Sequence, residues 1–236
     1  VDIYGKPSLP RLLKELEFID GDFMIRLLYA YPTNLNSELL DTIMDSNKTA
    51  KYLDIPLQHI NNRILKLMKR PTNGDFMRRL LDKLRADYPQ ITLRTTFIVG
   101  FPTETETEFR EILDFMAYYK FDRVGAFEYS REDGTYAAGL EPQVAKEVKR
   151  QRFRRLMEFQ RNISRVNNEK LVGTNLRVLT EIYDSQKHIF IGRSEKDAPL
   201  VDGVVKFTGE CQVGNIYTVK ILHAHDYDLR GAVIKS

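Results

Sequence analysis

The stretch ITLRTTFIVGF, residues 91–101, is the strongest strand signal in the chain and decides the fold. β-Branched and aromatic residues dominate it, and Gly100 with Pro102 closes it. A nearly continuous apolar strand is typical of a sheet that is covered on both faces or closed into a barrel. Arg94 interrupts the run, and a buried guanidinium is costly without a partner. We therefore expect its side chain to face the barrel lumen or an anion.

Further strand-like runs flank this stretch, so that four runs begin near residues 23, 51, 91 and 123. Segments with helical spacing of apolar residues separate them: Asn36–Met44, Arg63–Met68, Asp75–Tyr88 and Glu104–Tyr119. Repeated strand–helix alternation predicts parallel strands with crossover helices. The predicted fold class is α/β, a partial (βα) barrel with four parallel strands. The chain opens on a helix with no strand before it, so this barrel looks incomplete.

The pattern changes after Lys170. Short β-rich runs follow one another between turn residues: Asn175–Tyr183, His188–Arg193, Val201–Thr208, Ile216–His223 and Tyr227–Ile234. Five short strands in this length predict a small antiparallel OB-like barrel. We therefore expect two domains, residues 1–170 and residues 171–236.

The charge is unevenly distributed along the 236 residues. The formal net charge is +3, yet residues 143–170 alone hold nine Lys and Arg against three Glu. This segment is helix-like, without internal Gly or Pro, and its apolar residues are Val144, Val148, Leu156, Phe159, Ile163 and Val166. Its basic side is either a polyanion-binding face or the solvated outer face of a packing helix. Residues 171–236 are neutral, with eight basic and eight acidic residues.

Polar residues follow two of the predicted parallel strands, where working groups sit in such folds. Gln58 and His59 follow the run that begins near residue 51 and could hydrogen-bond a ligand hydroxyl. Asn61 or Asn62 beside them equally fits a helix cap. After residue 99, Gly100 lets a ligand approach the backbone, and Thr103 with Glu106 fits a capping box.

A third strand end is aromatic. Phe127 and Tyr129 are two residues apart, so they share one face of their strand and could wall an adenine. The alternative is that both are ordinary core residues. His223, His225 and Asp226 could bind a metal, or the histidines could simply lie on the surface of a strand.

Composition excludes several classes. One cysteine, Cys211, cannot form an internal disulfide or assemble a zinc or iron–sulfur site without other ligands. No apolar run approaches the roughly 18–20 residues of a membrane helix, and no signal segment opens the chain. We expect a reducing, cytoplasmic location and no membrane partner.

Several motifs together resemble the radical S-adenosylmethionine methylthiotransferases. In the first part of the chain they are Leu53–His59, Arg94–Thr105, Phe121–Phe127 with Tyr129 and Ser130, and Gly134–Thr135. In the tail they are Gly192–Ser194, Asp197–Pro199, Val201–Gly203 and Asp226–Gly231, which resemble the small TRAM barrel of one branch of that family. That branch methylthiolates an aspartate of small-subunit ribosomal protein twelve. The resemblance covers essentially the whole chain.

The family fold is a barrel of six βα units, so the resemblance makes the four strand-like runs the third to sixth. The first strand of the family is followed by a CxxxCxxC loop that holds a four-iron four-sulfur cluster, and an N-terminal domain holds a second cluster. Neither is in this sequence. We therefore expect a C-terminal fragment that is inactive alone, while the full-length enzyme uses S-adenosylmethionine, two clusters and an electron donor.

The resemblance also implies a cofactor site but no catalytic residue and no metal ligand within the chain. Gln58 and Arg94 would be the polar contacts to S-adenosylmethionine. The other contacts would be the backbone of Ile98, Val99 and Gly100, with Phe127 and Tyr129 near the adenine.

Two substrate classes remain open. Sister branches modify tRNA through the TRAM barrel, and RNA binding favours a positive surface. Here the barrel is neutral, and its acids would suit a basic protein loop: Glu195, Asp197, Asp202, Asp226 and Asp228. We therefore expect the ribosomal protein to dock near the TRAM domain, with tRNA as the alternative substrate. A third possibility is a module that binds the ribosomal protein without chemistry.

Overall fold

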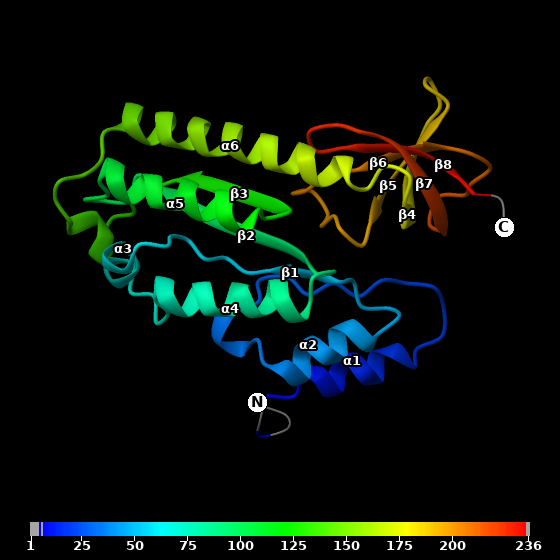
Figure 1. The fold of residues 1–236 in the computed structure, drawn as a ribbon, viewed down its shortest axis with the longest axis horizontal. Coiled ribbons are helices and arrows are strands. Elements are labelled where there is room, and N and C mark those ends of the chain that lie inside the picture. Colours follow the sequence, from blue (N-terminus) through cyan, green and yellow to red (C-terminus); the bar gives the residue numbers. More distant parts are fainter. Residues whose placement is uncertain (1–4, 6, 235–236) are drawn as a thin grey trace. The chain divides into compact units, whose positions relative to one another are not determined.

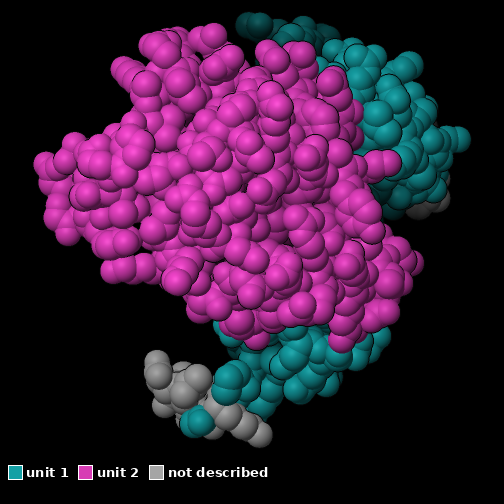
Figure 2. All heavy atoms as spheres, turned by 60° about the vertical axis from the view of Figure 1, so that its left-hand side comes forward, with its two compact units in different colours: residues 1–28, 34–52, 165–236 teal, residues 29–33, 53–164 magenta. Residues whose placement is uncertain are grey.

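A computed structural model describes residue 5 and residues 7–234 (Figure 1). Contacts between residues divide the chain into two compact units, coloured separately in Figure 2. Unit 1 comprises residues 1–28, 34–52 and 165–236, and unit 2 comprises residues 29–33 and 53–164. No helix in the described part of the chain is long and apolar enough to cross a membrane.

Unit 2 is built around a sheet in the order β1-β2-β3, with β1 at Tyr52–Asp54, β2 at Thr92–Val99 and β3 at Arg123–Glu128. β2 and β3 are parallel. The helices between the strands are α3 (Asn62–Leu67), α4 (Gly74–Asp87) and α5 (Glu106–Tyr119). Aromatic side chains fill the core beneath them: Phe97, Phe109, Phe115 and Phe121. The predicted α/β class and the parallel sheet are confirmed.

The run from residue 23 to residue 31 does not form the fourth regular strand that we predicted. Within unit 1, only a parallel bridge joins Ile25 to Thr49. Within unit 2, the Ala30 N–H donates to the Asp54 carbonyl at 2.7 Å, before the short 3-10 helix Pro32–Asn34. A strand requires a continuous ladder of backbone hydrogen bonds, and these isolated contacts do not make one. The sheet therefore has three strands among the described residues.

Side-chain caps determine where the helices of unit 2 begin. Asn61 accepts hydrogen bonds from the Arg63 and Ile64 N–H groups at 3.0 and 3.2 Å, which confirms its capping role at α3. The capping box of α5 is formed by Thr105 and Glu108. The predicted pair of Thr103 and Glu106 was therefore wrong by two residues.

Helix α6 (Lys146–Glu169) buries polar side chains together with Leu156, one of the apolar residues noted in its sequence. Arg152, Leu156, Gln160 and Ser164, spaced four residues apart, are buried. The Gln160 amide donates to the Phe121 carbonyl at 3.0 Å, so the buried side of the helix binds polar groups as well as apolar ones. In contrast, Val166 is 52% exposed.

The N-terminal part of unit 1 contains two helices, α1 (Leu9–Glu17) and α2 (Ser37–Asp45), which lie side by side (Figure 1). Its C-terminal part is a closed barrel in the order β4-β5-β6-β8-β7. The strands are β4 (Asn175–Asp184), β5 (Ile189–Ser194), β6 (Val205–Thr208), β7 (Ile216–Ala224) and β8 (Leu229–Val233).

The small barrel has the five strands and the closed form that we predicted. Its apolar core gathers side chains from all around the ring, among them Val178, Val205, Phe207, Val219 and Ile221. Four of its strand pairs are antiparallel, but β6 and β8 are parallel. The expectation of a wholly antiparallel barrel was wrong for that one pair, because β8 returns to close the ring rather than extending a meander.

Polar contacts connect the barrel to the N-terminal segments of the same unit. The Arg26 guanidinium donates to the Ser194 and Glu195 carbonyls at 3.1 and 2.8 Å. The buried Tyr52 hydroxyl donates to the Asp202 carboxylate at 2.6 Å. Residues 34–52 thus belong to the same compact unit as the barrel. A domain boundary near residue 170 stays a prediction.

Candidate cofactor-binding site

The carboxyl ends of β1, β2 and β3 lie at one edge of the sheet, since parallel strands run in the same direction. Gln58 follows β1 there and has a left-handed backbone, with φ of 70°. Its N–H donates to the Thr96 carbonyl and its carbonyl accepts from the Ile98 N–H, both at 2.8 Å. Its side-chain Oε1 is buried and has no hydrogen-bond partner among the described residues. A buried amide oxygen without a partner is costly, and a ligand donor would satisfy it.

Arg94 of β2 is paired within the protein. Its Nη1 donates to Asp54 Oδ1 at 2.9 Å and to Thr96 Oγ1 at 3.2 Å. Both members of the ion pair are nearly buried, with 9% of Arg94 and 2% of Asp54 exposed. Gly125 on β3 leaves room for the guanidinium, because a Cβ there would lie 3.1 Å from Arg94 Nη2. The anion that Arg94 was expected to face is thus a carboxylate of this chain. Sequence reasoning did not assign Asp54 that role.

A buried carboxylate shapes the turn after β2. Glu104 is 4% exposed and accepts hydrogen bonds from the Gly100 N–H, at 3.1 and 3.0 Å to its two oxygens. Arg152 of α6 donates to the same carboxylate at 2.7 Å. Gly100 has φ of 71°, a backbone conformation that favours glycine. Because the Gly100 N–H is already bonded to Glu104, it is not open to a ligand in this arrangement.

His59 faces this same carboxylate. The ring is fully buried, and its Nδ1 accepts from the Ile60 and Asn61 N–H groups at 2.9 and 3.0 Å. Two donors at Nδ1 place the proton of the neutral ring on Nε2, which lies 3.5 Å from Glu104 Oε2. Nε2 is buried and has no hydrogen-bond partner among the described residues, so the hypothesis that His59 hydrogen-bonds a ligand hydroxyl stays a prediction.

The predicted aromatic wall is only partly assembled. The Tyr129 ring packs edge-to-face on Phe101, with centroids 5.3 Å apart, and its hydroxyl is buried without a partner among the described residues. Lys149 of α6 donates to the Tyr129 carbonyl at 2.9 Å and lies over the ring. Burial lowers the pKa of Lys149, and Glu128 opposes that shift. Phe127 is 63% exposed, so the structure does not show it and Tyr129 packed as one surface.

The remaining predicted contacts, Ile98 and Val99, lie at the end of β2. Val99 is fully buried, and its carbonyl accepts from the Tyr129 N–H at 2.9 Å. The Ile98 side chain is half-buried. Six of the seven predicted cofactor residues lie at or just beyond the carboxyl ends of the three strands, whereas Arg94 lies in the first half of β2, level with Arg123 at the start of β3. Gln58 and Tyr129 offer polar atoms without a partner among the described residues. The contact of all seven residues with a cofactor stays a prediction.

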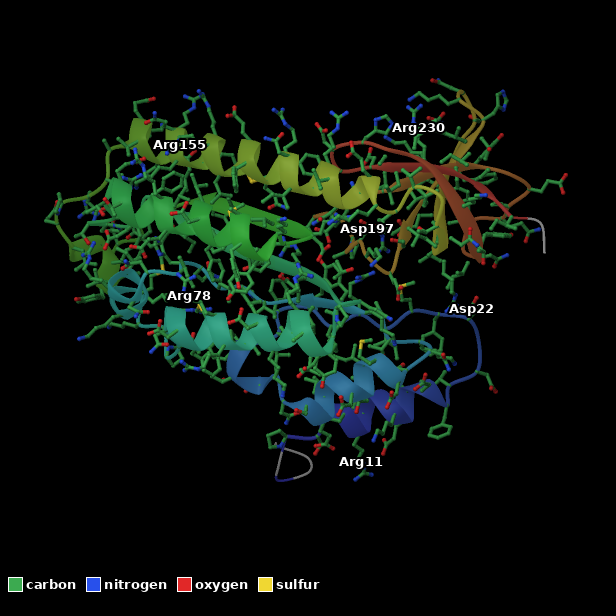
Figure 3. All side chains as sticks on the ribbon, viewed as in Figure 1. Arg11, Asp22, Arg78, Arg155, Asp197 and Arg230 are labelled. Atoms are coloured by element: carbon green, nitrogen blue, oxygen red, sulfur yellow. The ribbon has the colours of Figure 1, made fainter. Side chains whose placement is uncertain are left out.

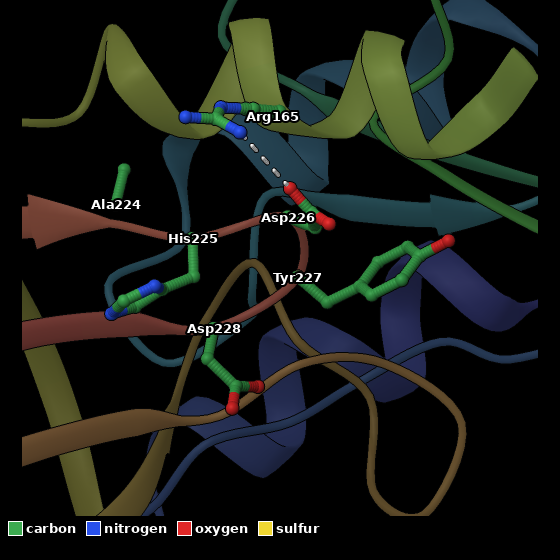
Figure 4. Close-up of a pocket in the computed structure, with 6 residues that line it drawn as sticks. All are labelled: Arg165, Ala224, His225, Asp226, Tyr227 and Asp228. Carbon is green, nitrogen blue, oxygen red and sulfur yellow. Dashed lines mark ion pairs between the residues drawn. The ribbon is translucent and has the colours of Figure 1, made fainter. Parts of the chain in front are cut away.

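The barrel of unit 1 holds a separate hollow of about 350 Å³ on its surface. Figure 4 shows its lining, in which Arg165 faces Asp226 at 3.8 Å and His225 points away from that pair. In the described part of the chain, no three His, Cys, Asp or Glu side chains gather as metal ligands. The metal hypothesis for His223 and His225 therefore has no third ligand there.

Most acids of the small barrel have partners within the protein. Asp197 is 2% exposed and accepts from Ser194 Oγ at 2.7 Å. Asp202 accepts from Tyr52 and from the Ala198 N–H, and Asp228 pairs with Lys206 at 2.6 Å. These three carboxylates stabilise the barrel, so they do not form the open acidic face that we predicted.

Two family models match the chain: the Radical SAM superfamily over residues 4–116 and the TRAM domain over residues 172–234. Among solved structures, coproporphyrinogen III oxidase (HemN) of Escherichia coli, a radical SAM enzyme, is similar with a TM-score of 0.53 and 20% identity. That match covers 66% of this chain and 37% of the other, and it supports the fold alone. The chain therefore combines a radical S-adenosylmethionine domain with a TRAM domain.

Within that class, the chain is similar to curated proteins named ribosomal protein uS12 methylthiotransferase RimO. Identity is 48% with that of Pelotomaculum thermopropionicum, 45% with that of Geobacter sulfurreducens and 44% with that of Desulforamulus reducens. The matches cover 98–99% of this chain but 53% of each relative, so the chain spans about half their length. The resemblance to the methylthiotransferases is confirmed.

Proposed function

We propose that the protein, at full length, is a methylthiotransferase that acts on the β-carbon of an aspartate in ribosomal protein uS12 by radical S-adenosylmethionine chemistry. The observation that carries this proposal is 43–48% identity with the named relatives over nearly the whole chain. A cytoplasmic location follows from a ribosomal substrate. Since the chain spans about half of those relatives, the activity belongs to the whole protein.

S-adenosylmethionine would be held at the carboxyl edge of the sheet. The residues present fit a polar, partly aromatic ligand, because the buried Gln58 Oε1 and Tyr129 hydroxyl there have no protein partner. When bound beside a reduced cluster, the cofactor supplies hydrogen-abstracting radical chemistry. The Asp54–Arg94 pair, the Ile98–Gly100 backbone and Phe127 would orient it and exclude water.

The clusters would be held elsewhere. A four-iron four-sulfur cluster needs three or four cysteine thiolates, and this chain has only Cys211. Burial raises the pKa of that thiol, which disfavours the thiolate that ligates iron. We therefore place the ligands of two clusters outside these 236 residues, together with the contact for the electron donor.

The ribosomal protein would dock near the TRAM domain. Support comes from the neutral charge of residues 171–236 and from the loop between β5 and β6. Leu200 at its tip is fully exposed with φ of 67°, and Val201 is 58% exposed. Asp202 holds the base of this loop through Tyr52 and Ala198, so the apolar tip is presented on a fixed frame. An exposed apolar pair suits a protein contact better than a phosphate backbone.

The decisive experiment uses the full-length protein, reconstituted anaerobically with iron and sulfide and given S-adenosylmethionine, a reductant and uS12. Mass spectrometry is expected to find one methylthio group on one aspartate. Parallel reactions with tRNA test the sister activity, and modification of tRNA alone would replace the proposal. Tight binding of uS12 without any mass change would make the protein a binding module. Leu200→Ser is expected to raise KM for uS12 without changing S-adenosylmethionine binding.

A further inference from the structure

The outer side of α6 carries a row of cations. Lys146, Arg150 and Arg154 are spaced four residues apart, and Arg161 follows two helical turns later, so all four project from one side of the helix. All four are exposed. Figure 3 shows nitrogen-tipped side chains along this upper side of α6. We call these four residues the basic row.

Other cations of the same helix have clear structural partners. Arg152 binds Glu104, and Arg155, labelled in Figure 3, binds Glu106 at 2.7 Å. By contrast, within residues 7–234 no carboxylate lies within 4.0 Å of Lys146, Arg150 or Arg154. These three cations are therefore not used to hold the fold together.

The charge of the exposed side remains positive after its own acids are counted. The acids between residues 146 and 161 are Glu147 and Glu158, so the four cations of the basic row exceed them by two. Lys146, Arg150 and Arg154 follow one another at about 6 Å along the axis, Arg161 lies about 10 Å further, and the whole row extends over about 22 Å. A line of exposed positive charges of this length suits a linear polyanion better than a single small anion.

The basic row begins beside the candidate cofactor site. Lys149 lies in the same first turn of α6 as Lys146, and its Nζ donates to the Tyr129 carbonyl. The Lys149 stem fills the space in which a side chain at Gly100 would sit. A polyanion bound along the row would thus run past the edge of the sheet at which a substrate residue must enter.

We propose that the basic row binds the phosphate backbone of structured RNA, so that the protein meets its substrate on the RNA-containing small subunit and not as a free protein. This inference rests on the proposed function, because a ribosomal protein in its assembled state is surrounded by RNA. That setting favours RNA over an anionic membrane as the polyanion.

The first test measures binding of full-length protein to a labelled RNA duplex and to small ribosomal subunits over a range of salt concentrations. For the triple variant Lys146→Ala, Arg150→Ala and Arg154→Ala, the slope of log K against log salt is expected to fall by about 2–3, with an affinity loss of about tenfold or more. A matched control removes three exposed cations near α3 and α4 instead, by Lys66→Ala, Lys69→Ala and Arg79→Ala.

The control variant has the same net charge and is expected to keep the wild-type slope. Equal slopes for the two triple variants would overturn the proposal. So would a wild-type protein that binds phosphatidylserine vesicles but not RNA. Circular dichroism of each variant confirms folding, and the exposed positions of all six side chains make loss of the fold unexpected.

A second test separates this inference from the proposed function. Methylthiolation is measured on isolated uS12 and on assembled small subunits. The basic-row variant is expected to retain activity on isolated uS12 and to lose about tenfold or more in kcat/KM on subunits. Equal losses on both substrates would overturn the RNA role. If the wild type binds RNA through the row but modifies neither substrate, the RNA surface stands and the proposed function is wrong.

Discussion

The contribution of the buried Asp54–Arg94 ion pair to the free energy of unfolding can be tested quantitatively. Replacing Arg94 with Met leaves a carboxylate that is 2% exposed without its cation. Replacing Asp54 with Leu leaves the guanidinium without its anion. Breaking one side of a buried ion pair costs about 3–5 kcal/mol, because the remaining charge stays desolvated. Each single variant is therefore expected to lose about 3 kcal/mol or more.

The double variant Asp54→Leu with Arg94→Met removes both charges and keeps much of the buried volume. Such apolar replacements of buried ion pairs are often neutral. We expect its stability to lie within about 1 kcal/mol of the wild type, which corresponds to a coupling energy of about 5 kcal/mol or more between the two residues.

Urea unfolding followed by circular dichroism measures these differences. With a slope of about 3 kcal/mol per M, each single variant is expected to lower the midpoint by about 1 M. If the double variant is as unstable as the sum of the single variants, the two residues do not compensate one another and the reasoning is refuted. If Arg94 also contacts S-adenosylmethionine, the full-length double variant remains folded but binds the cofactor at least tenfold more weakly by equilibrium dialysis.

Three further predictions concern other contacts. Burial acts to raise the pKa of Glu108, but hydrogen bonds from Arg63 and Thr105 outweigh it and lower the pKa to about 2 from 4.5. Because the folded pKa is the lower one, this stability is present above pH 4.5, and about 2 kcal/mol of it is lost between pH 7 and pH 3. Urea titrations of Glu108→Gln are expected to lack that dependence, and an unchanged pH profile would contradict it. Tyr52→Phe is expected to cost about 1 kcal/mol by loss of the hydroxyl bond to Asp202, as a lower urea midpoint; no shift in that midpoint would argue against the bond. Anaerobic reconstitution of these 236 residues with iron and sulfide is expected to give no four-iron four-sulfur absorbance, whereas a stable cluster spectrum would disprove that its ligands lie elsewhere.

The sequence predicted elements whose signals are local. The β-branched run that became β2 and the five short strands of the small barrel were recognisable because side-chain periodicity and turn residues define them. The run from residue 23 to residue 31 had the same composition as a strand, but it lacks a continuous hydrogen-bonding neighbour. Strand pairing depends on the whole fold, so composition alone could not show that this run forms no regular strand.

The candidate site was predictable in outline but not in its polar detail. Gln58 and Gly100 lie beyond strand ends, as the sequence predicted, whereas Arg94 lies within β2; cofactor contact at that edge stays a prediction. The buried partners Asp54 and Glu104 were missed because a carboxylate in a sequence normally signals an exposed position. Only the fold brings Asp54 to Arg94 and Glu104 to Arg152, across 40 and 48 residues of chain. A charge within an apolar strand was the one signal that could have prompted a search for its partner.

The contact between Tyr52 and Asp202 joins residues that are 150 positions apart. During synthesis, the N-terminal segments of unit 1 leave the ribosome long before the barrel that completes them. At about 5–20 residues per second, the 150 residues from Tyr52 to Asp202 take roughly 8–30 s to be made. Tyr52 lacks its partner throughout that interval, so unit 1 completes its fold only after the barrel has been synthesised. Truncation near the C-terminus is therefore expected to expose residues at the opposite end of the chain to proteases.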